Sequence, residues 1–303
     1  MLLDTAALYF RAFHGVPDTV RSPDGRPVNA VRGLLDMIAR LTAEFSPTHL
    51  VACWDDDWRP RWRVDLIPSY KAHRVAPEAV GGPDVETVPD PLEAQVPVIR
   101  EVLAALGIAI VGAAEHEADD VIGTLAATAD MPVDVVTGDR DLFQVVDDAR
   151  AVRVVYTGRG MARLEVLDDA AVLARHGVHA AQYADLAALR GDPSDGLPGI
   201  AGIGEKTAAQ LLAKFGDLDG IRAAASDPSS PMAASVRAKL EAASDYLDVA
   251  PSVVEVVRDL ALAPFDAGLR PLSPEQQAEL ARLSAEHGIG TSVERVIRSL
   301  SEP

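Results

Sequence analysis

The 303-residue sequence contains one cysteine, four lysines and no apolar run long enough to cross a membrane. A lone cysteine, Cys53, excludes an internal disulfide and a metal site built from thiolates, so any metal would be held by oxygen. A membrane span needs roughly 18 apolar residues, and Asp4 interrupts the only apolar N-terminus that a signal peptide could use. These absences predict a cytoplasmic protein without a membrane partner.

The charge is unevenly distributed along the chain. The formal net charge of −18 speaks against a nucleic-acid partner, because phosphate binding relies on Lys and Arg. Residues 59–74 nevertheless carry five cations against one aspartate, a net charge of +4: Arg59, Arg61, Arg63, Lys71, Arg74 and Asp65. An acidic chain with one basic segment indicates a metal site that faces an anionic substrate.

Apolar runs and helical periodicity alternate over the first 180 residues. Buried strands are expected at residues 1–4, 49–54, 108–111, 133–137 and 152–156, and helices at 31–45, 91–106 (beginning or kinking at Pro97) and 117–128. This alternation predicts an α/β fold, with a mostly parallel sheet flanked by helices. The basic, aromatic and Pro/Gly-rich segment of about 58–92 predicts a partly helical excursion with a flexible return.

The pattern changes after residue 180, where the sequence becomes almost wholly helical, beginning with a helix at 183–190. We therefore expect a core of residues 1–180 and a helical region of residues 181–303.

Carboxylates recur where these elements end or begin. They are Asp4, Asp55, Glu117, Asp119, Asp120, Asp139 and Asp141 in the sheet region, and Asp192 and Asp195 after the helix 183–190. Asp55 is preferred over the next two aspartates because it directly follows the strand. Any one of these acids could be a helix cap or a solvated turn, and acids at 117–120 also suit the positive end of a helix dipole.

Their recurrence at several strand ends favours a common site, because the carboxyl ends of parallel strands meet at one edge of a sheet. So many acids in one cleft need divalent cations, and Mg²⁺ or Mn²⁺ suits an all-oxygen site. Two such ions can activate a water and stabilise a leaving oxygen, so the chemistry indicated is phosphodiester hydrolysis.

A glycine-rich turn at 198–204 opens a second helix, predicted to run to about Phe215. Glycines allow close backbone approach to a phosphate, and a helix N-terminus directs free N–H groups at it. A simple helix connection is the alternative, but the turn follows Asp192 and Asp195 within ten residues. It is typical of a helix-hairpin-helix element that binds the DNA backbone without reading bases.

The basic segment has two interpretations. It could be a solvated face, or Lys71 and Arg74 could neutralise a scissile phosphate. Tyr70, Trp58 and Trp62 could stack on unpaired bases or serve as packing residues.

Taken together, these motifs resemble the bacterial 5′-nuclease family, which comprises flap endonucleases and the 5′–3′ exonuclease domain attached to DNA polymerase I. The matching motifs lie between residues 2 and about 215, in the family's order. They are Leu3-Asp4, Arg11-Ala12-Phe13-His14, Trp54-Asp55, Arg63, Tyr70-Lys71-Ala72-His73-Arg74, Glu117-Ala118-Asp119-Asp120, Thr137-Gly138-Asp139-Arg140-Asp141 and the run 191–199 that enters the glycine turn.

The resemblance implies a PIN-like nuclease core, a helical arch at about 58–92 and a helix-three-turn-helix element for duplex DNA. It implies that Asp4, Asp55, Glu117 and Asp119 bind one metal, with Asp120 in or beside that shell. Asp141, Asp192 and Asp195 would serve a second metal, with Asp139 between the two. Lys71 and Arg74 would act on the cleaved phosphate, supported by Arg63. DNA contacts are implied for Arg11, Tyr70, Gly199, Gly202, Gly204, Lys206 and Thr207, and a K⁺ ion for the glycine turn.

The expected protein is a stand-alone, bacterial, nucleoid-associated and monomeric nuclease. Its expected substrates are DNA 5′ flaps, overhangs and nicks in replication and repair, together with 5′ ends of RNA primers. The sequence departs from the family pattern at Gly196, where asparagine is frequent, and in the stretch 75–91. The alternatives are a PIN-type ribonuclease, which would lack the basic arch and the glycine turn, and a non-catalytic DNA-binding protein, which would lack some of the nine acids.

Overall fold

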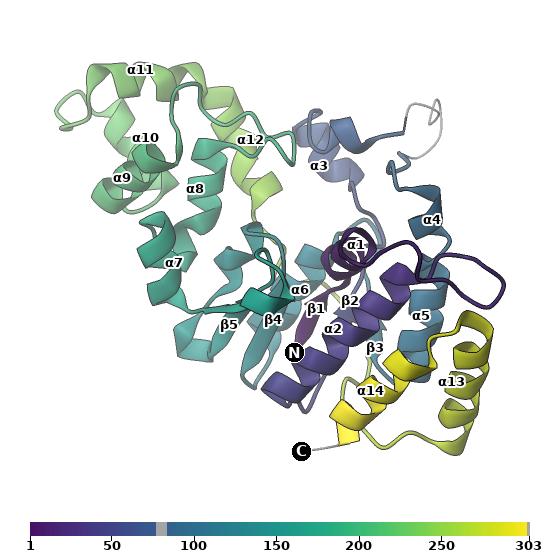
Figure 1. Ribbon diagram of the computed structural model, residues 1–303. Helices are drawn as coiled ribbons and strands as arrows, with labels where there is room; N and C mark the ends of the chain where they lie inside the picture. Colours follow the sequence, from purple (N-terminus) through teal and green to yellow (C-terminus); the bar gives the residue numbers. More distant parts are fainter. Residues whose placement is uncertain (77–83, 302–303) are drawn as a thin grey trace.

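A single sheet organises the first half of the chain (Figure 1). The computed structural model describes residues 1–76 and 84–301. Within them, six strands lie in the order β3-β2-β1-β4-β5-β6. Neighbouring strands are parallel except β5 and β6, so the predicted mostly parallel sheet is confirmed. The strands are β1 (Leu2–Asp4), β2 (Val51–Cys53), β3 (Ala109–Val111), β4 (Val133–Thr137), β5 (Val152–Tyr156) and β6 (Glu165–Leu167).

Both faces of this sheet are buried, because successive side chains of each strand enter different cores. Leu2 belongs to one core and Leu3 to the other, and Val154 and Val155 divide in the same way. The parallel register sets Leu3 of β1 beside Ala52 of β2 and Val136 of β4. A sheet covered by helices on both faces requires strands whose side chains are apolar on both faces.

The helices of the first half divide between the two faces. On one face lie α1 (Thr5–Gly15), α2 (Asn29–Phe45) and α5 (Val96–Ala105), whose buried residues share a core with Leu3 and Val136. On the other lies α6 (Ala118–Thr128), packed with the helical region beyond it. The predicted helices at 31–45 and 117–128 are confirmed within two residues of their ends.

The predicted helix at 91–106 is interrupted in the structure. It forms as α4 (Asp90–Glu93) and α5, with Gln95 between them. The Gln95 side chain accepts a hydrogen bond from the N–H of Ala30, 2.8 Å away, so it is anchored to α2. Pro97 stands in the first turn of α5, where its missing N–H costs nothing.

Three strands or helices were not expected from the sequence: α1, β6 and the helix α7 (Asp169–His176), which lies before the predicted helical region. Helix α1 begins directly after β1, and Asp4 caps it by accepting a hydrogen bond from the N–H of Ala7 at 3.1 Å. Strand β6 has three residues and joins the edge antiparallel to β5, too short for a clear period-2 pattern.

The chain after residue 180 is helical, as predicted. It contains α8 (Tyr183–Arg190), α9 (Glu205–Phe215), α10 (Leu218–Ser226), α11 (Ala234–Ala242), α12 (Ser244–Val254), α13 (Pro274–His287) and α14 (Gly290–Ser301). Among the described residues, no helix is long and apolar enough to cross a membrane.

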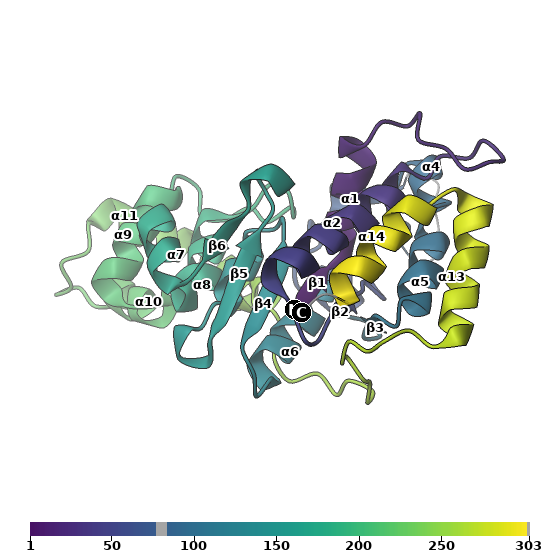
Figure 2. The ribbon, with the colours of Figure 1, turned by 60° about the horizontal axis from the view of Figure 1, so that its bottom comes forward.

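The last two helices pack in the core that contains Leu3 of β1. Figures 1 and 2 show α14 beside α2 and α13 beside α5, away from α8–α12. Leu283, Val293 and Val296 are buried in the same core as Leu34 and Ile38 of α2. The sequence grouped these helices with the region 181–303, whereas their packing joins them to the sheet half of the molecule.

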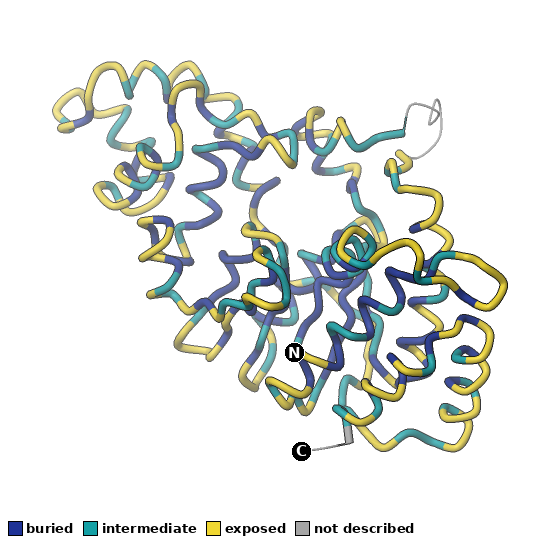
Figure 3. The backbone as a smooth tube through the Cα atoms, viewed as in Figure 1, coloured by how far each residue is buried: buried dark blue, intermediate teal, exposed yellow. Residues whose placement is uncertain are grey.

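The predicted arch segment, residues 58–92, contains little regular helix. It holds α3 (Arg61–Leu66) and the short 3₁₀ turn η1 (Ala72–Arg74) before its return. Residues 77–83 of the expected flexible return lie outside the described residues. On either side of them, Val75 and Glu86 form an antiparallel bridge, with the N–H of Ala76 donating to Val85 at 2.8 Å. In Figure 3 the buried parts of the backbone follow the sheet and the inner helices.

Candidate active site

The predicted acids meet where the strand order reverses. The sheet continues from β1 to β2 on one side and to β4 on the other, and such a switch point leaves a crevice at the carboxyl ends of the strands. Asp4 ends β1, Asp55 follows β2, and Asp139 follows β4. A cavity of about 160 Å³ at this edge is lined by acids and cations, among them Asp4, Asp55, Glu117, Asp119, Asp139, Lys71 and Arg74.

The first group of acids lies nearest β1 and β2 and comprises Asp4, Asp55, Asp119 and Glu117. The pKa values of the first three are raised. Burial and the neighbouring Asp55 and Asp139 raise the pKa of Asp4 to about 7, although the Thr137 hydroxyl donates to it at 2.7 Å. Burial also raises the pKa of Asp55. The pKa of Asp119 lies well above its ordinary value because of burial and the charges of Asp4 and Asp139. These carboxylates therefore repel one another at close range.

A second group of acids lies around Asp141. Burial and the charges of Asp139, Asp195 and Asp192 raise its pKa well above the ordinary value. Burial likewise raises the pKa of Asp195. The charge of Asp139 acts on members of both groups.

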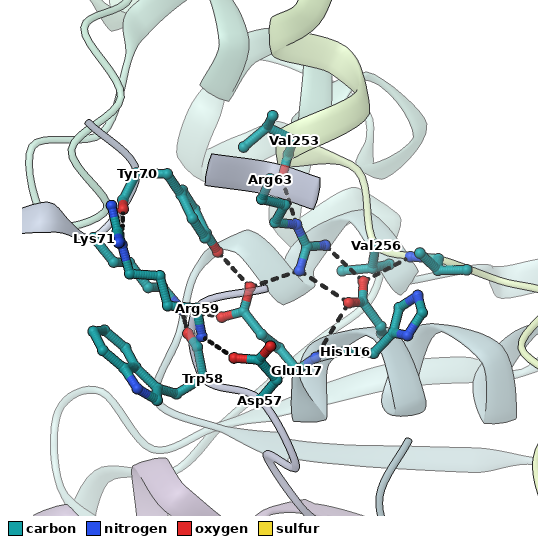
Figure 4. Close-up of polar contacts among 12 residues, drawn as sticks. Asp57, Trp58, Arg59, Arg63, Tyr70, Lys71, His116, Glu117, Val253 and Val256 are labelled. Carbon is teal, nitrogen blue, oxygen red and sulfur yellow. Dashed lines mark hydrogen bonds and ion pairs between the residues drawn. The ribbon is translucent and has the colours of Figure 1, made fainter. Parts of the chain in front are cut away.

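Glu117 differs from the other acids because cations surround it. Arg63 Nη1 lies 2.6 Å from Glu117 Oε2, the Tyr70 hydroxyl donates to the same oxygen at 2.6 Å, and Lys71 Nζ pairs with Oε1 (Figure 4). Burial alone would raise the pKa of Glu117, but Lys71 and Arg63 bring it below its ordinary value.

The structure gives Asp120 and Arg63 a supporting position behind the site. Asp120 is fully buried and accepts hydrogen bonds from both terminal nitrogens of Arg63, from Val257 N–H and from Glu117 N–H. Its oxygens are thus engaged by protein donors, which disagrees with a metal ligand. The side chain of Arg63 is 3% exposed and also donates to the carbonyl of Val253, so it does not face a substrate phosphate.

Tyr70 is also placed differently from the prediction. It is 4% exposed, packs in a core with Ile67 and Leu197, and donates its hydroxyl to Glu117. A ring buried in this way cannot stack on a base, so the packing interpretation is correct and the DNA contact is wrong.

Lys71 and Arg74 reach the second group of acids through a loop contact. The N–H of Lys71 donates to the carbonyl of Asp195 at 2.8 Å, and Arg74 Nη2 lies 2.9 Å from Asp195 Oδ1. Gly196 allows this approach, because a Cβ there would lie 2.0 Å from the carbonyl oxygen of Ser69. The glycine that departs from the family pattern is therefore required by the close contact with the arch segment.

The glycine turn lies directly behind the acidic loop. A Cβ on Gly199 would lie 2.4 Å from the carbonyl oxygen of Arg190, so the two loops pack backbone against backbone. Gly204 precedes α9, which carries Lys206 and Thr207 in its first turn. Lys239 Nζ donates to the carbonyl of Gly202 at 2.8 Å, so an ammonium group already contacts the turn where K⁺ was expected.

Arg11 lies on α1, beside the turn that follows β4. Its Nη2 would be 3.2 Å from a Cβ added at Gly138, in the turn after β4.

The sequence interpretation missed Glu86. It lines the acidic cavity from the stretch 75–91, and burial raises its pKa while Arg74 and Lys71 oppose that rise. Glu86 belongs to no recognisable motif, and its antiparallel bridge with Val75 brings it to the site.

The donor chemistry of the site fits hard divalent cations. The acids offer oxygen ligands, and Asp141 Oδ1 is buried without a hydrogen-bond partner among the described residues. In the part of the chain that the structure describes, no group of three or more His, Cys, Asp or Glu side chains is arranged so that it could hold a metal ion. Lys71 instead compensates Glu117 at this edge.

Residues 1–177 match the sequence model of the 5′–3′ exonuclease N-terminal resolvase-like domain, and residues 178–277 match that of the 5′–3′ exonuclease C-terminal SAM fold. The chain belongs to the 5′–3′ exonuclease family. A relative described as a 5′–3′ exonuclease from Streptomyces coelicolor is 60% identical over 301 residues, which cover 99% of this chain and 100% of that protein. One from Mycobacterium tuberculosis is 53% identical over 311 residues, covering 99% and 97%.

Other members of the family are longer. DNA polymerase I of Mycobacterium tuberculosis is 38% identical over 294 residues, which are 93% of this chain and 30% of the polymerase.

Solved structures confirm the fold. T5 5′-exonuclease with bound zinc has a TM-score of 0.61 at 16% identity, covering 99% of this chain and 97% of that one. The catalytic core of Rad2 in complex with a DNA substrate has a TM-score of 0.60 at 17% identity, covering 99% and 91%.

The position of Arg63 predicts a structural role in this exonuclease. The substitution Arg63→Met leaves Asp120 and Glu117 buried without their shared cation and should lower the free energy of unfolding by about 3–5 kcal/mol. Arg61 offers a matched control on the same helix, because its pair with Asp65 is exposed. Urea denaturation should show Arg61→Met close to wild type, and equal midpoints for both variants would contradict this role.

The raised pKa of Asp4 predicts a pH dependence. Between its ordinary value of 3.8 and about 7, folded Asp4 holds a proton that the unfolded chain has lost, so stability falls as pH rises through this window. Cations bind the ionised form, so Mn²⁺ should raise the thermal midpoint more at about pH 8 than at about pH 5.5. Scanning fluorimetry in EDTA and in Mn²⁺ measures both effects, and Asp4→Asn should weaken both. A pH-independent Mn²⁺ shift would contradict the assignment.

Proposed function

We propose that this chain is a divalent-metal-dependent 5′-nuclease that hydrolyses DNA phosphodiesters at 5′ flaps and 5′ ends. The observation that carries the proposal is the meeting of two groups of acids at the strand switch point, opposite Lys71 and Arg74. Family membership and the high identity to proteins described as 5′–3′ exonucleases support the same activity.

The acids would hold two divalent cations, Mg²⁺ or Mn²⁺. Asp4, Asp55, Glu117 and Asp119 would serve one, and Asp141, Asp192 and Asp195 the other, with Asp139 between them. The bound ions would supply an activated water and stabilise the leaving oxygen. Zinc bound to T5 5′-exonuclease supports a metal requirement in this fold.

The cations of the chain would bind and orient the phosphate. Lys71 pairs with Glu117, and Arg74 pairs with Asp195, so each already lies against an acid of a different group. A phosphate at this edge would face both side chains and have its negative charge neutralised. Arg63 would act only through Glu117, by holding the carboxylate in place.

The glycine turn and the first turn of α9 would grip the duplex backbone. The exposed side chain of Lys206, Thr207 and the N-terminus of α9 offer donors to phosphate oxygens. Arg11 would contact DNA near the turn that follows β4. The Rad2 core in complex with DNA substrate supports a DNA partner for this fold.

The finer expectations remain part of the proposal. They are a monomer with a core of residues 1–180 and a helical region of residues 181–303 whose last two helices pack on that core, a nucleoid-associated cytoplasmic location, and action on 5′ ends of RNA primers. A K⁺ ion at the glycine turn would have to share the Gly202 carbonyl with Lys239.

A labelled 5′-flap duplex tests the activity. Purified protein should release a product near the junction of single strand and duplex in Mg²⁺ or Mn²⁺ and none in EDTA. Asp141→Asn should abolish cleavage while retaining flap binding, because it removes a charge from the second acidic group. Absence of metal-dependent cleavage would sink the proposal. Preferential cleavage of RNA hairpins would favour a PIN-type ribonuclease, and binding alone a non-catalytic DNA-binding protein.

Lys71 provides a second test. If its ammonium neutralises the reacting phosphate, Lys71→Ala should lower the turnover number by about 100-fold or more, and flap affinity far less. Single-turnover cleavage and fluorescence anisotropy separate the two quantities. Lys214→Ala is the matched control, because Lys214 lies at the end of α9 and donates to the carbonyl of Pro231. A loss of affinity as large as the loss of turnover would assign Lys71 to DNA binding.

A further inference from the structure

Arg190 lies at the junction of the acidic loop and the glycine turn. It is the last residue of α8, and its side chain is 13% exposed. Its Nε donates to the carbonyl of Gly191 at 3.1 Å, which directs the guanidinium group away from α8 and between two carboxylates. Nη2 lies 3.5 Å from Asp192 Oδ2, and Nη1 lies 3.6 Å from Glu205 Oε2.

These two carboxylates belong to different parts of the site. Asp192 is in the second acidic group, whereas Glu205 is the first residue of α9, directly after the glycine turn. The backbones of the two loops are locked together, because Ile200 N–H donates to the carbonyl of Leu189 at 3.0 Å. The guanidinium group of Arg190 adds a side-chain connection between Asp192 and Glu205 to this packing.

The guanidinium group of Arg190 lies at similar distances from the carboxylates of Asp192 and Glu205. Charge-assisted hydrogen bonds are usually about 2.7–2.9 Å long, so neither distance is at its optimum. Arg190 Nη1 is buried without a well-formed hydrogen bond in the described part of the chain, and the buried hydroxyl of Tyr183 lies close to the guanidinium group. His176 Nδ1, at the end of α7, lies 2.8 Å from Glu205 Oε1, so Glu205 is shared between His176 and Arg190.

We propose that Arg190 is a positioning residue that couples the DNA-binding turn to the orientation of Asp192. The inference rests on the nuclease function proposed above. When duplex DNA engages the turn and the start of α9, the shift of Glu205 settles the guanidinium group and thereby aligns Asp192 with the other acids. Arginine suits this role because its planar fork donates in two directions at once, whereas lysine is a point charge.

The test compares Arg190→Met and Arg190→Lys with a control, Arg153→Met, which removes an arginine paired with Asp134 on β5 and β4. Steady-state cleavage of a 5′-flap duplex in Mg²⁺ gives kcat and KM, and anisotropy in EDTA gives flap affinity. Arg190→Met should lower kcat by about 10- to 100-fold with KM and affinity within about twofold, and Arg190→Lys should recover part of the loss. The control should match wild type.

Glu205→Gln tests the other end of the connection and remains informative if Arg190→Met fails to fold. It should also lower kcat more than it changes KM. The double variant Arg190→Met/Glu205→Gln should be no slower than Arg190→Met alone, because both changes break one pathway. Additive losses, or an unchanged kcat in Glu205→Gln, would overturn the coupling.

The two proposals fail in different ways. If wild-type protein does not cleave flap DNA with metal, the nuclease function itself fails. If wild type cleaves and Arg190→Met retains its kcat, only the role of Arg190 is overturned. A parallel loss of kcat and flap affinity would likewise overturn it, because it would place Arg190 in DNA binding.

Discussion

Repulsion between carboxylates at one edge of the sheet is the constraint on which the rest of the site depends. Parallel strands bring Asp4, Asp55 and Asp139 to the same crevice, and burial there raises the pKa of Asp4 and Asp55. An uncompensated cluster of this kind opposes folding, so the chain must bring cations to it from elsewhere. They come from the arch segment and from the end of α8, which are distant from β1 in sequence.

These cations compensate the acids in two different ways. Arg63 and Asp120 form a buried ion pair, and the carboxylate of Asp120 also accepts a hydrogen bond from the N–H of Val257. This pair holds the arch segment against α6. Lys71, Arg74 and Arg190 instead pair with acids at the cavity or at its rim. Under the proposed function, a metal ion or a phosphate would replace contacts of this second kind, whereas the pair of Arg63 and Asp120 would remain.

Much of the fold and of the site followed from local patterns. Three elements form at their predicted residues: the strands at 133–137 and 152–156 and the helix at 183–190. The spacing of the apolar residues in each segment indicates whether it forms a strand or a helix. The gathering of acids at strand ends followed from the same rule. The interruption at Gln95 could not be predicted, because it depends on a hydrogen bond to Ala30, which is 65 residues away.

By itself, the sequence determined most of the strands and helices, the acidic residues that gather at the sheet edge and the family of the chain. These depend on residue type and spacing, which are local properties. Only the tertiary structure decided that Arg63 and Tyr70 are buried and hold Glu117, and that Glu86 lines the cavity. It also decided that α13 and α14 pack in the core that contains Leu3. The physical reason is that such roles depend on which distant side chains compensate a buried charge or cover an apolar face, and no local pattern records that choice.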